Sequence, residues 1–489
     1  MIDIKNPPSL KEIAGRTDHV FQVAAKSTRL LRDNWDPDKG TPVFTVKGRY
    51  TSRGWTEWTQ GFQFGNAIYL FDATGDQEFI DWGRERTLSL MAPHLTHIGV
   101  HDHGFNNVST YGNLLRLARE GRIDVPEGEQ ELYRTALMAS GAVQAARWSY
   151  AAGGLGYVPS FNGKHSLFAD TIRSMRALAL AHQFGHVLMG EQDEKISLLK
   201  RLLLHAETTA RYNVYFGTGR DSYDIRGRTA HESIFNTANG VYRCPSTQQG
   251  YCPYTTWTRG LSWVLLGYAE LLEWLETVDE SEFDGLDVPG METKKAAISR
   301  CRETAQAVSD FFIEQTPTDG VCYWDTGAPG LVHLGDYLDR PAEPFNDHEP
   351  ADSSAAAICA QGLFRLGRHL DGGSQPAAGG GRHAAGDGDQ AAAGAEGGAN
   401  SPGSKYTAAA LRICDTVFQD PYLATGADHE GILLHVIYHR PNGWDYVPPG
   451  SKIPYGESAL WGDYHLLELA VYVKRLAEEK PYLSFFAGL

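Results

Sequence analysis

The chain has 489 residues, which is long enough to bury a large hydrophobic core in a single domain or in about three. Its 44 lysines and arginines are outnumbered by 60 aspartates and glutamates, so the formal net charge is -16, and no run of five basic residues occurs. These counts argue against nucleic acid or an anionic membrane surface as a partner. An anionic small ligand would need a few positive groups placed close together.

Residues 1–12 are polar and lack the apolar core of a secretory signal, and no stretch approaches the ~18 apolar residues of a membrane span. We therefore expect a cytoplasmic protein without a membrane segment, present as a monomer or a homodimer. The six cysteines show no CxxC spacing. Cys244 and Cys252 flank Gln249 and could pair, but a cytoplasmic location favours reduced thiols.

Helical periodicity recurs along the chain, whereas the alternation typical of strands hardly appears. Two amphipathic helix faces are clear from the spacing of apolar residues. One is formed by Ala297, Cys301, Ala305, Val308 and Phe312, and the other by Leu460, Tyr464, Leu467 and Val471. The pattern also predicts ten helices. In chain order they lie at about 63–74, 77–92, 104–120, 128–151, 168–184, 193–212, 258–276, 353–369, 405–418 and 457–477. Short antiparallel strands are expected at a rim, for example near 432–438.

About a dozen helices without alternating strands indicate an all-α fold built from helical hairpins. Periodicity alone does not separate a closed barrel of six hairpins from an open helical solenoid, since both stack antiparallel helix pairs. Residues 371–404 contain no Leu, Ile, Val, Met, Phe, Tyr or Trp. Such a segment has no large side chains to bury, so we predict a disordered low-complexity insertion between two hairpins.

The stretch 254–263 reads Tyr-Thr-Thr-Trp-Thr-Arg-Gly-Leu-Ser-Trp and places two tryptophans and one arginine at a predicted helix start. Trp257 and Trp263 offer flat faces for the apolar side of a sugar ring, and Arg259 offers a planar fork of donors for a carboxylate or hydroxyls. The alternative is a buried aromatic pair beside a surface arginine.

Two aspartates are candidates for acid–base chemistry. Asp102 lies between His101 and His103 at a loop or helix start, where a carboxylate can stay ionised. Asp170 lies among apolar residues, so partial burial should raise the pKa of its carboxyl group. Such an asymmetry gives one site a proton donor and a proton acceptor near neutral pH. Asp170 could instead only cap or brace a helix.

The sequence His101-Asp102-His103 also suggests a metal site. In an extended strand, however, the three side chains alternate between faces and cannot all converge on one ion, and no fourth ligand stands at helical spacing. We therefore predict neither a metal nor another cofactor.

Several short blocks resembling sugar-site motifs follow one another in a characteristic order. They are Trp58-Thr59-Gln60-Gly61-Phe62, His101-Asp102-His103-Gly104-Phe105, Phe168-Ala169-Asp170-Thr171-Ile172, His231 with Gln249-Gly250, Trp257-Thr258-Arg259-Gly260, Asp352-Ser353-Ser354-Ala355-Ala356 and Trp461-Gly462-Asp463-Tyr464. Each block is a weak signal, but their order and the 18 positions between His231 and Gln249 are specific. Over most of its length the chain resembles the unsaturated glucuronyl hydrolases of glycoside hydrolase family 88.

The resemblance implies one catalytic (α/α)6-barrel domain over residues 1–489. It also implies a hydrolase that removes a 4,5-unsaturated uronic acid from the non-reducing end of oligosaccharides made by lyases, through hydration of the C4=C5 bond. Asp170 would be the general acid and then the base, with Asp102 assisting. The substrate-binding residues by position are Trp58, His101, His231, Gln249, Trp257, Arg259 and Trp263.

This sequence departs from the family pattern at Leu261, where glutamine is usual, and at Ser174, where asparagine is common. Both differences leave the acid pair intact and bear on substrate preference. Lys164, Arg173 and Arg176 could add contacts to an anion, although we expect two of these three to be solvated.

Three alternatives remain open on the same barrel. An unsaturated rhamnogalacturonyl hydrolase of family 105 would use a similar hydration, although the His101 and Trp257 blocks favour family 88. A sugar epimerase would depend on paired histidines. A non-catalytic sugar-binding toroid would have no need for a desolvated acid such as Asp170.

Overall fold

The computed structural model describes residues 1–53, 57–373, 401–426 and 428–486. Most of the predicted insertion at 371–404 therefore lies outside the described residues. Its two ends are described and lie together, because the Asp371 carboxylate accepts hydrogen bonds from the Gly403 amide at 2.7 Å and the Ser401 hydroxyl at 3.0 Å. The helices on either side of the insertion are thus joined at its base.

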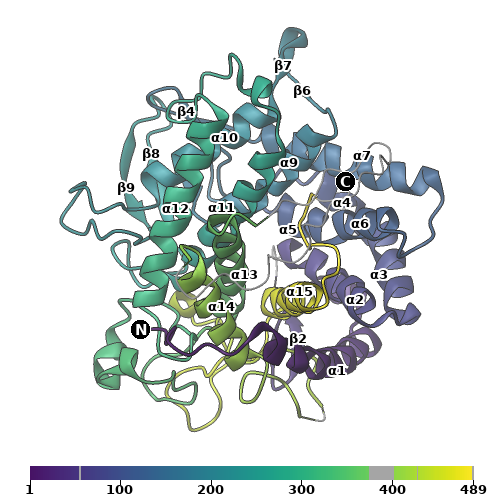
Figure 1. Ribbon diagram of the computed structural model, residues 1–489, viewed down its shortest axis with the longest axis vertical. Helices are drawn as coiled ribbons and strands as arrows, with labels where there is room; N and C mark the ends of the chain where they lie inside the picture. Colours follow the sequence, from purple (N-terminus) through teal and green to yellow (C-terminus); the bar gives the residue numbers. More distant parts are fainter. Residues whose placement is uncertain (54–56, 374–400, 427, 487–489) are drawn as a thin grey trace.

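The described helices form six hairpins, each with an outer and an inner member. The outer helices are α1 (Leu10–Asn34), α3 (Gln77–Leu90), α7 (Glu127–Ala146), α10 (Leu198–Tyr212), α12 (Lys294–Glu314) and α14 (Ser404–Val417). The inner members are α2 (Gln60–Thr74), the segment α5 to α6, the pair α8 and α9, α11 (Thr258–Thr277), α13 (Ser353–Leu370) and α15 (Leu460–Ala477). In Figure 1, α11, α13 and α15 lie near the centre, with α12, α14 and α1 outside them.

Contacts between the first and last inner helices close this ring. Helix α15 packs against α2 as well as α13, and α1 packs against both α15 and α14. The inner helices α2, α11, α13 and α15 are buried on nearly every side, whereas outer helices such as α1 and α3 bury one face. Closure excludes the open solenoid and confirms the (α/α)6 barrel.

Helix α1 was not predicted, although the sequence carries a start signal for it. The Ser9 hydroxyl accepts a hydrogen bond from the Glu12 amide, and the Glu12 carboxylate accepts one from the Ser9 amide, which together form a capping box. Buried positions then recur every three or four residues, at Ile13, Thr17, Val20, Ala24, Ser27 and Leu31. Two threonine or serine positions in this face weaken the apolar pattern.

Two predicted inner helices are interrupted. Instead of one helix at 104–120, the chain forms α5 (His103–Asn107), a π-helical turn η3 (Val108–Gly112) and α6 (Asn113–Arg119). Instead of one at 168–184, it forms strand β5 (Ser166–Phe168), α8 (Thr171–Ser174) and α9 (Arg176–Gln183). Pairing of β5 with a neighbouring strand delays the helix start, which leaves Asp170 immediately before α8 as its N-cap residue.

The strands are short and lie in the loops. They are β1 (Pro42–Val46), β2 (Arg49–Ser52), β3 (Ser149–Ala151), β4 (Leu155–Tyr157), β5, β6 (Leu188–Met189), β7 (Lys195–Ile196), β8 (Glu232–Phe235) and β9 (Tyr242–Ser246). Strands β5, β8 and β9 form an antiparallel sheet in that order, and the others pair as hairpins. Strands β3 and β7 replace one end of the helices predicted at 128–151 and 193–212. A further short helix, α4, spans Ala92–Leu95.

The strand predicted near 432–438 is wrong, because only an isolated bridge between Leu423 and Leu433 forms there. The Asp463 carboxylate accepts hydrogen bonds from the amides of Ile432 and Leu433 at 2.9 and 2.8 Å, so no strand ladder is needed to satisfy them. His435 also has a φ of 64°, which breaks an extended backbone.

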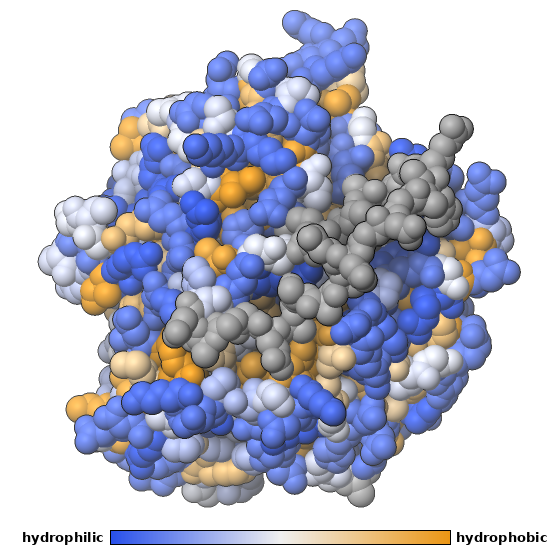
Figure 2. Space-filling view, viewed as in Figure 1, coloured by the Kyte–Doolittle hydropathy of each residue, from blue (hydrophilic) through white to orange (hydrophobic). Residues whose placement is uncertain are grey.

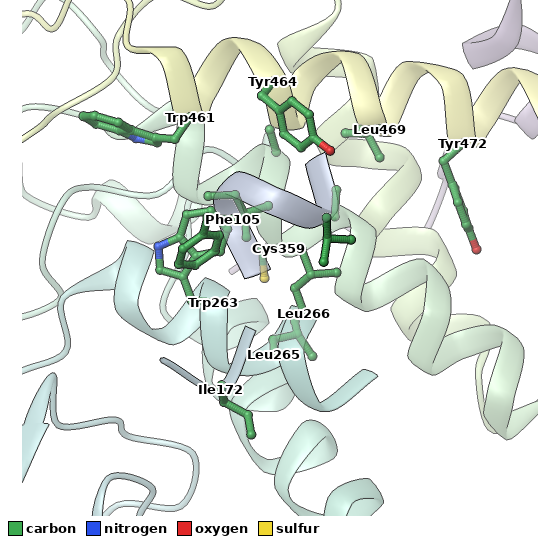
Figure 3. Close-up of a cluster of buried hydrophobic side chains, with 14 of the residues drawn as sticks. Phe105, Ile172, Trp263, Leu265, Leu266, Cys359, Trp461, Tyr464, Leu469 and Tyr472 are labelled. Carbon is green, nitrogen blue, oxygen red and sulfur yellow. The ribbon is translucent and has the colours of Figure 1, made fainter. Parts of the chain in front are cut away.

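One hydrophobic core cluster runs from Ile2 to Phe486 through all the inner helices. Figure 3 shows part of it, in which Phe105 and Trp263 lie side by side while Trp461, Tyr464, Leu469 and Tyr472 project from α15. The face shown in Figure 2 is mostly hydrophilic, with hydrophobic residues in small separate groups. No helix within the described ranges is both long enough and apolar enough to cross a membrane.

Candidate active site

The N-terminal ends of the inner helices meet at one mouth of the barrel. Trp58 precedes α2 and stacks on Trp461, at the start of α15, with ring centroids 5.2 Å apart. The guanidinium of Arg259, at the start of α11, lies 4.6 Å from the Trp461 ring, and Asp352 caps α13. Helix N-termini carry partial positive charge, so this mouth suits an anionic ligand although the whole chain is negative.

The two predicted acids stand at this mouth, each immediately before an inner helix. Asp102 precedes α5 and Asp170 precedes α8. These helices touch closely, because the Gly104 amide donates a hydrogen bond of 2.8 Å to the Ser174 hydroxyl. A Cβ on Gly104 would lie 2.4 Å from the Ser174 carbonyl oxygen, so only glycine allows this approach. The contact fixes the spacing of the acids.

His101 lies between the two carboxylates. Its Nε2 is 3.2 Å from Asp170 Oδ2 and 3.6 Å from Asp102 Oδ1. The three residues are buried, and one ligand atom from each lies within 4.8 Å of the others. The Phe161 ring stacks on the imidazole of His101 at 6.0 Å, which limits its rotation. A proton can therefore pass between His101 and Asp170 over a hydrogen bond, and Asp102 lies just beyond that distance.

His231 approaches Asp170 from the position immediately before strand β8. The Ala169 amide donates a hydrogen bond to the His231 carbonyl. This bond lies next to the pairing of β5 with β8, in which Phe168 is opposite Glu232. Nδ1 of His231 accepts hydrogen bonds from the amides of Gln248 and Gln249, at 3.0 and 3.3 Å. Because Nδ1 is occupied as an acceptor, the ring carries its proton on Nε2, which lies 3.6 Å from Asp170 Oδ1.

The two acids are asymmetric, but in the opposite sense to the prediction. Burial, reinforced by the nearby charge of Asp170, raises the pKa of Asp102, and His101 only partly offsets this. Burial also acts on Asp170, but the hydrogen bond from His101 and the nearby imidazole of His231 hold its pKa below the ordinary value. Despite burial, the two carboxylates raise the pKa of His101. In the substrate-free protein Asp170 is therefore the ionised partner.

A metal site would require several ligand side chains to lie close to one point. His103 hydrogen-bonds the Ser140 hydroxyl and the His97 carbonyl, both at 3.0 Å, so the His-Asp-His triplet does not act as a unit. His101, Asp102 and Asp170 do converge, and their nitrogen and oxygen atoms are of the type that divalent ions such as zinc bind. The group is thus a possible three-ligand set, which sequence spacing did not suggest.

Arg259 joins two loops of the site and is only 1% exposed; we call this arrangement the clamp. Its guanidinium lies between the rings of Trp257 and Trp461, at 4.7 and 4.6 Å. Nη2 donates to Gln249 Oε1 at 3.0 Å and to the Tyr438 carbonyl at 2.7 Å. The clamp holds the Gln249 loop against the loop that contains Tyr438.

The three predicted tryptophans differ in the residues that they contact. The Trp257 ring meets the His231 ring edge-on at 4.6 Å and forms a wall beside it. Trp58 is partly buried at the rim. Trp263 is 3% exposed and packs on Phe105 and His465 at 4.9 and 4.8 Å, so it supports α5 from the core. The sequence did not reveal that Trp263 lies behind Phe105.

The expected solvation of two cations among Lys164, Arg173 and Arg176 is wrong. Arg173 and Arg176 are buried, and Arg173 lies 2.9 Å from Glu270 and 3.2 Å from Glu468. Lys164 is exposed. Arg173 and Arg176 therefore belong to ion pairs in the barrel interior.

Several site residues were missed by sequence reasoning. Phe161 and Phe168 flank His101, with Phe168 edge-on at 5.5 Å. The amides of Tyr438 and His439 donate to the Asp445 carboxylate, which fixes the Tyr438 loop. Phe168 stood in a quoted block, whereas no sequence pattern links the Tyr438 carbonyl to Arg259. Cys244 and Cys252 are both free thiols.

Buried polar atoms without a hydrogen-bond partner among the described residues gather around the acids. They include His101 Nδ1, Asp170 Oδ1, His231 Nε2, Arg259 Nε, Asp352 Oδ2 and His439 Nδ1. Buried polar groups are normally paired, so such a concentration is typical of a site that binds a polar ligand.

No protein-family model matches the chain, but two other comparisons find similar proteins. An unsaturated glucuronyl hydrolase of Bacillus sp. strain GL1 is 24% identical over 444 residues, which make up 90% of this chain and 92% of that protein. An unsaturated chondroitin disaccharide hydrolase of Streptococcus pneumoniae is 25% identical over 380 residues, or 75% of this chain and 78% of that protein. The crystal structure of the Bacillus sp. GL1 unsaturated glucuronyl hydrolase matches with a TM-score of 0.64 at 20% identity, over 95% of this chain and 97% of that one.

The chain is thus similar over nearly its whole length to unsaturated glucuronyl hydrolases, at low sequence identity. Solved unsaturated glucuronyl hydrolases are (α/α)6 barrels, which agrees with the six closed hairpins. The low identity leaves the activity and the roles of individual residues to be argued from the site.

Proposed function

We propose that this protein is a hydrolase that removes a 4,5-unsaturated glucuronic acid from the non-reducing end of lyase-generated oligosaccharides. The observation that carries the proposal is the buried group of Asp102, His101 and Asp170 at the mouth formed by the inner helix N-termini. Relatives named as unsaturated glucuronyl and chondroitin disaccharide hydrolases support the substrate class.

The reaction is a hydration rather than a direct displacement at the anomeric carbon. A proton adds to C4 of the vinyl ether, and a water oxygen adds to C5 while its proton passes to a base. The resulting hemiketal opens to a keto sugar acid and releases the rest of the oligosaccharide. The usual link between carboxylate separation and anomeric stereochemistry therefore does not apply.

Asp170 is the acid and then the base in this proposal, and Asp102 assists. Because Asp170 is ionised before substrate binds, its proton comes from His101, whose Nε2 is 3.2 Å away. An entering uronate adds a like charge and excludes water, and both effects raise the pKa of Asp170. Proton transfer to Asp170 thus accompanies binding, and the cluster titrates as one unit.

Side chains around the acid cluster would hold the substrate. Trp257 and Trp58 wall the sugar ring, and His101, His231 and Gln249 hydrogen-bond its hydroxyls. Arg259 donates a hydrogen bond to Gln249 and Trp263 packs on Phe105, so we assign both of them positioning roles through these neighbours. The helix N-termini supply the attraction for the sugar carboxylate.

A substrate panel tests this proposal. The wild-type protein is incubated with unsaturated disaccharides from glycosaminoglycan, rhamnogalacturonan and other polysaccharide lyases, and loss of the conjugated ultraviolet absorbance is followed. Turnover of a glucuronyl disaccharide is the expected result. Selective turnover of the rhamnogalacturonyl substrate would move the chain to the family 105 activity. Binding without turnover would indicate a sugar-binding toroid. A product that keeps the absorbance but has an inverted configuration would indicate an epimerase.

A further inference from the structure

A polar stripe on the outer helix α7 faces the segment that carries His101 and Asp102. Its members are Ser140, Gln144 and Arg147, which recur at helical spacing along the last two turns of α7 and its C-cap. Helix α7 lies outside α5 and packs against it (Figure 1). The buried face of an outer helix is normally apolar, because burial of polar groups costs free energy unless they are hydrogen-bonded. Packing alone therefore does not explain this stripe.

Gln144 joins the two segments of chain that carry the acids. It is fully buried, and its Nε2 donates to the His101 carbonyl at 2.7 Å and to the Ser174 hydroxyl at 2.9 Å. His101 immediately precedes Asp102, and Ser174 ends the four-residue helix α8 that follows Asp170. One side-chain amide on the outer helix thus ties the backbone beside one acid to the helix that begins at the other.

Arg147 holds the loops on both sides of the His101 ring. Its Nη2 donates to the carbonyls of residues 159–160 at 3.0 and 2.8 Å, and its Nη1 donates to the Ile98 carbonyl. Ile98 lies three residues before His101, and residue 160 immediately precedes Phe161, whose ring stacks on the His101 imidazole. The planar fork of an arginine can hold three carbonyls at once, which a lysine ammonium cannot do in the same geometry.

Ser140 continues the contact along α5. Its hydroxyl accepts a hydrogen bond from Asn107 Nδ2 at 2.8 Å and lies 3.0 Å from Nδ1 of His103. On the same helix, a Cβ on Gly141 would lie 2.4 Å from the Ala177 carbonyl oxygen, so α7 also approaches α9 closely. The outer helix is therefore fixed against both inner segments that carry the acid cluster.

We propose that Gln144 and Arg147 are positioning residues for the acid cluster, and that together they hold the His101 imidazole against Asp170. This inference rests on the proposed function, in which His101 supplies the proton of Asp170. Neither residue touches the reacting atoms. Gln144 fixes the backbone of His101, and Arg147 fixes the loop whose aromatic ring stacks on the imidazole. Loss of either lets the imidazole turn away, while the tryptophan walls that hold the sugar stay in place.

Gln144→Met tests the first contact, because it keeps a side chain of similar length and removes both donors. On an unsaturated glucuronyl disaccharide, kcat should fall at least about tenfold while KM stays within about threefold, since small displacements of catalytic groups slow the reaction more than they weaken binding. Unchanged kcat in the folded variant would overturn the role of Gln144.

Gln361→Met is the matched control. Gln361 on α13 is also fully buried, and its Nε2 donates to the His465 carbonyl at 3.0 Å. It lies eight residues, roughly 12 Å, along α13 from the helix start at the mouth. Gln361→Met should lower the melting temperature about as much as Gln144→Met and leave kcat within about twofold of wild type. Equal losses of kcat in both variants would show a general effect of stability and overturn the inference.

Arg147→Met should also lower kcat about tenfold, and Arg147→Lys should recover only part of the loss, since lysine restores the charge but not the fork. Wild-type kcat in Arg147→Lys would overturn the role of this side chain as a brace. Arg147 is only partly buried, so its variants test the inference even if Gln144→Met does not fold.

A spectroscopic measurement separates this inference from the proposed function. If wild type turns over no unsaturated disaccharide, the hydrolase proposal fails, but the placement of His101 can still be measured. In protein with isotope-labelled histidine, the imidazole Nε2 proton of His101 is assigned by its absence in His101→Gln and reports the hydrogen bond to Asp170. Gln144→Met and Arg147→Met should shift or broaden this resonance, and Gln361→Met should not. An unchanged resonance in both site variants would overturn the inference.

Discussion

Two buried charged clusters lie toward opposite ends of the inner helices, and they differ in how completely their charges are paired. Near the helix C-termini, Asp72 accepts from Arg116, Arg122 and Arg475 at 2.7–3.2 Å. At the N-terminal mouth, Asp170 meets only histidines, and its Oδ1 has no hydrogen bond in the described structure. Full pairing with arginine keeps a carboxylate ionised and inert. Partial pairing with imidazoles leaves it able to exchange a proton.

Asp170→Asn gives the largest expected effect at the mouth. The amide fills the same volume but cannot transfer a proton, so kcat should fall by at least ~10²-fold while the melting temperature changes little. Steady-state rates and a thermal melt measure the two quantities. Retention of more than about a tenth of the wild-type rate would remove Asp170 from the mechanism.

Asp102→Asn should also be severe, and it should change the pH profile. Asp102 helps to raise the pKa of His101 above its ordinary 6.5, so wild-type activity should decline only on the alkaline side of that value, as His101 loses its proton. Removing the carboxylate lowers the pKa of His101 and moves this alkaline limb to lower pH. An unshifted limb in the residual activity would show that Asp102 does not act on His101.

Asp72→Asn should lower stability and leave catalysis nearly unchanged, the opposite of the effect of Asp170→Asn. Three arginines would lose part of their buried partner, which typically costs about 3–5 kcal/mol of stability. The melting temperature should drop by several degrees, whereas kcat/KM of the folded protein should stay within about twofold, since distant sites act independently. Asp18→Asn is the control, because Asp18 is 71% exposed and its pair with Lys474 contributes little. A large loss of kcat/KM in folded Asp72→Asn would contradict the division between the clusters.

Deletion of residues 374–400 should have a small effect on both clusters. The segment has no large apolar side chains, and Asp371 already holds the flanking residues Ser401 and Gly403. Melting temperature and kcat/KM of the deletion variant should match wild type closely. A fall of many degrees would show that the segment packs on the barrel.

Chelation is expected to have no effect on activity. In the proposed reaction the double bond is activated by a proton, so His101, Asp102 and Asp170 exchange protons rather than ligate an ion. Activity after exhaustive EDTA dialysis, together with elemental analysis, measures this. Loss that is restored by one equivalent of a divalent ion would make the three residues metal ligands.

The sequence was informative where residues close in the chain carry a pattern. The helical periods predicted most of the barrel, and the quoted blocks located both acids and His231. Helix α1 was missed although Ser9 and Glu12 form its capping box. The break that places Asp170 before α8 depends on pairing between β5 and β8, which local periodicity does not encode.

Long-range contacts account for the rest. The pKa of Asp170 was predicted in the wrong direction because His101 and His231, 69 and 61 positions away, outweigh its apolar neighbours. The sequence also gave no sign of the contacts of Arg259, which is held by the Tyr438 carbonyl 179 positions away and lies 3.7 Å from Asp352. Contacts between residues so far apart in the chain form only when the barrel closes.

The central claim is that the acid cluster hydrates a C4=C5 bond, and the most direct test compares an unsaturated glucuronyl disaccharide with its saturated counterpart. Wild type should release the second sugar from the unsaturated substrate at the rate at which the conjugated absorbance disappears. The saturated disaccharide should not be cleaved, since it has no double bond to protonate. Cleavage of both at comparable rates would contradict hydration and indicate an ordinary displacement at the anomeric carbon.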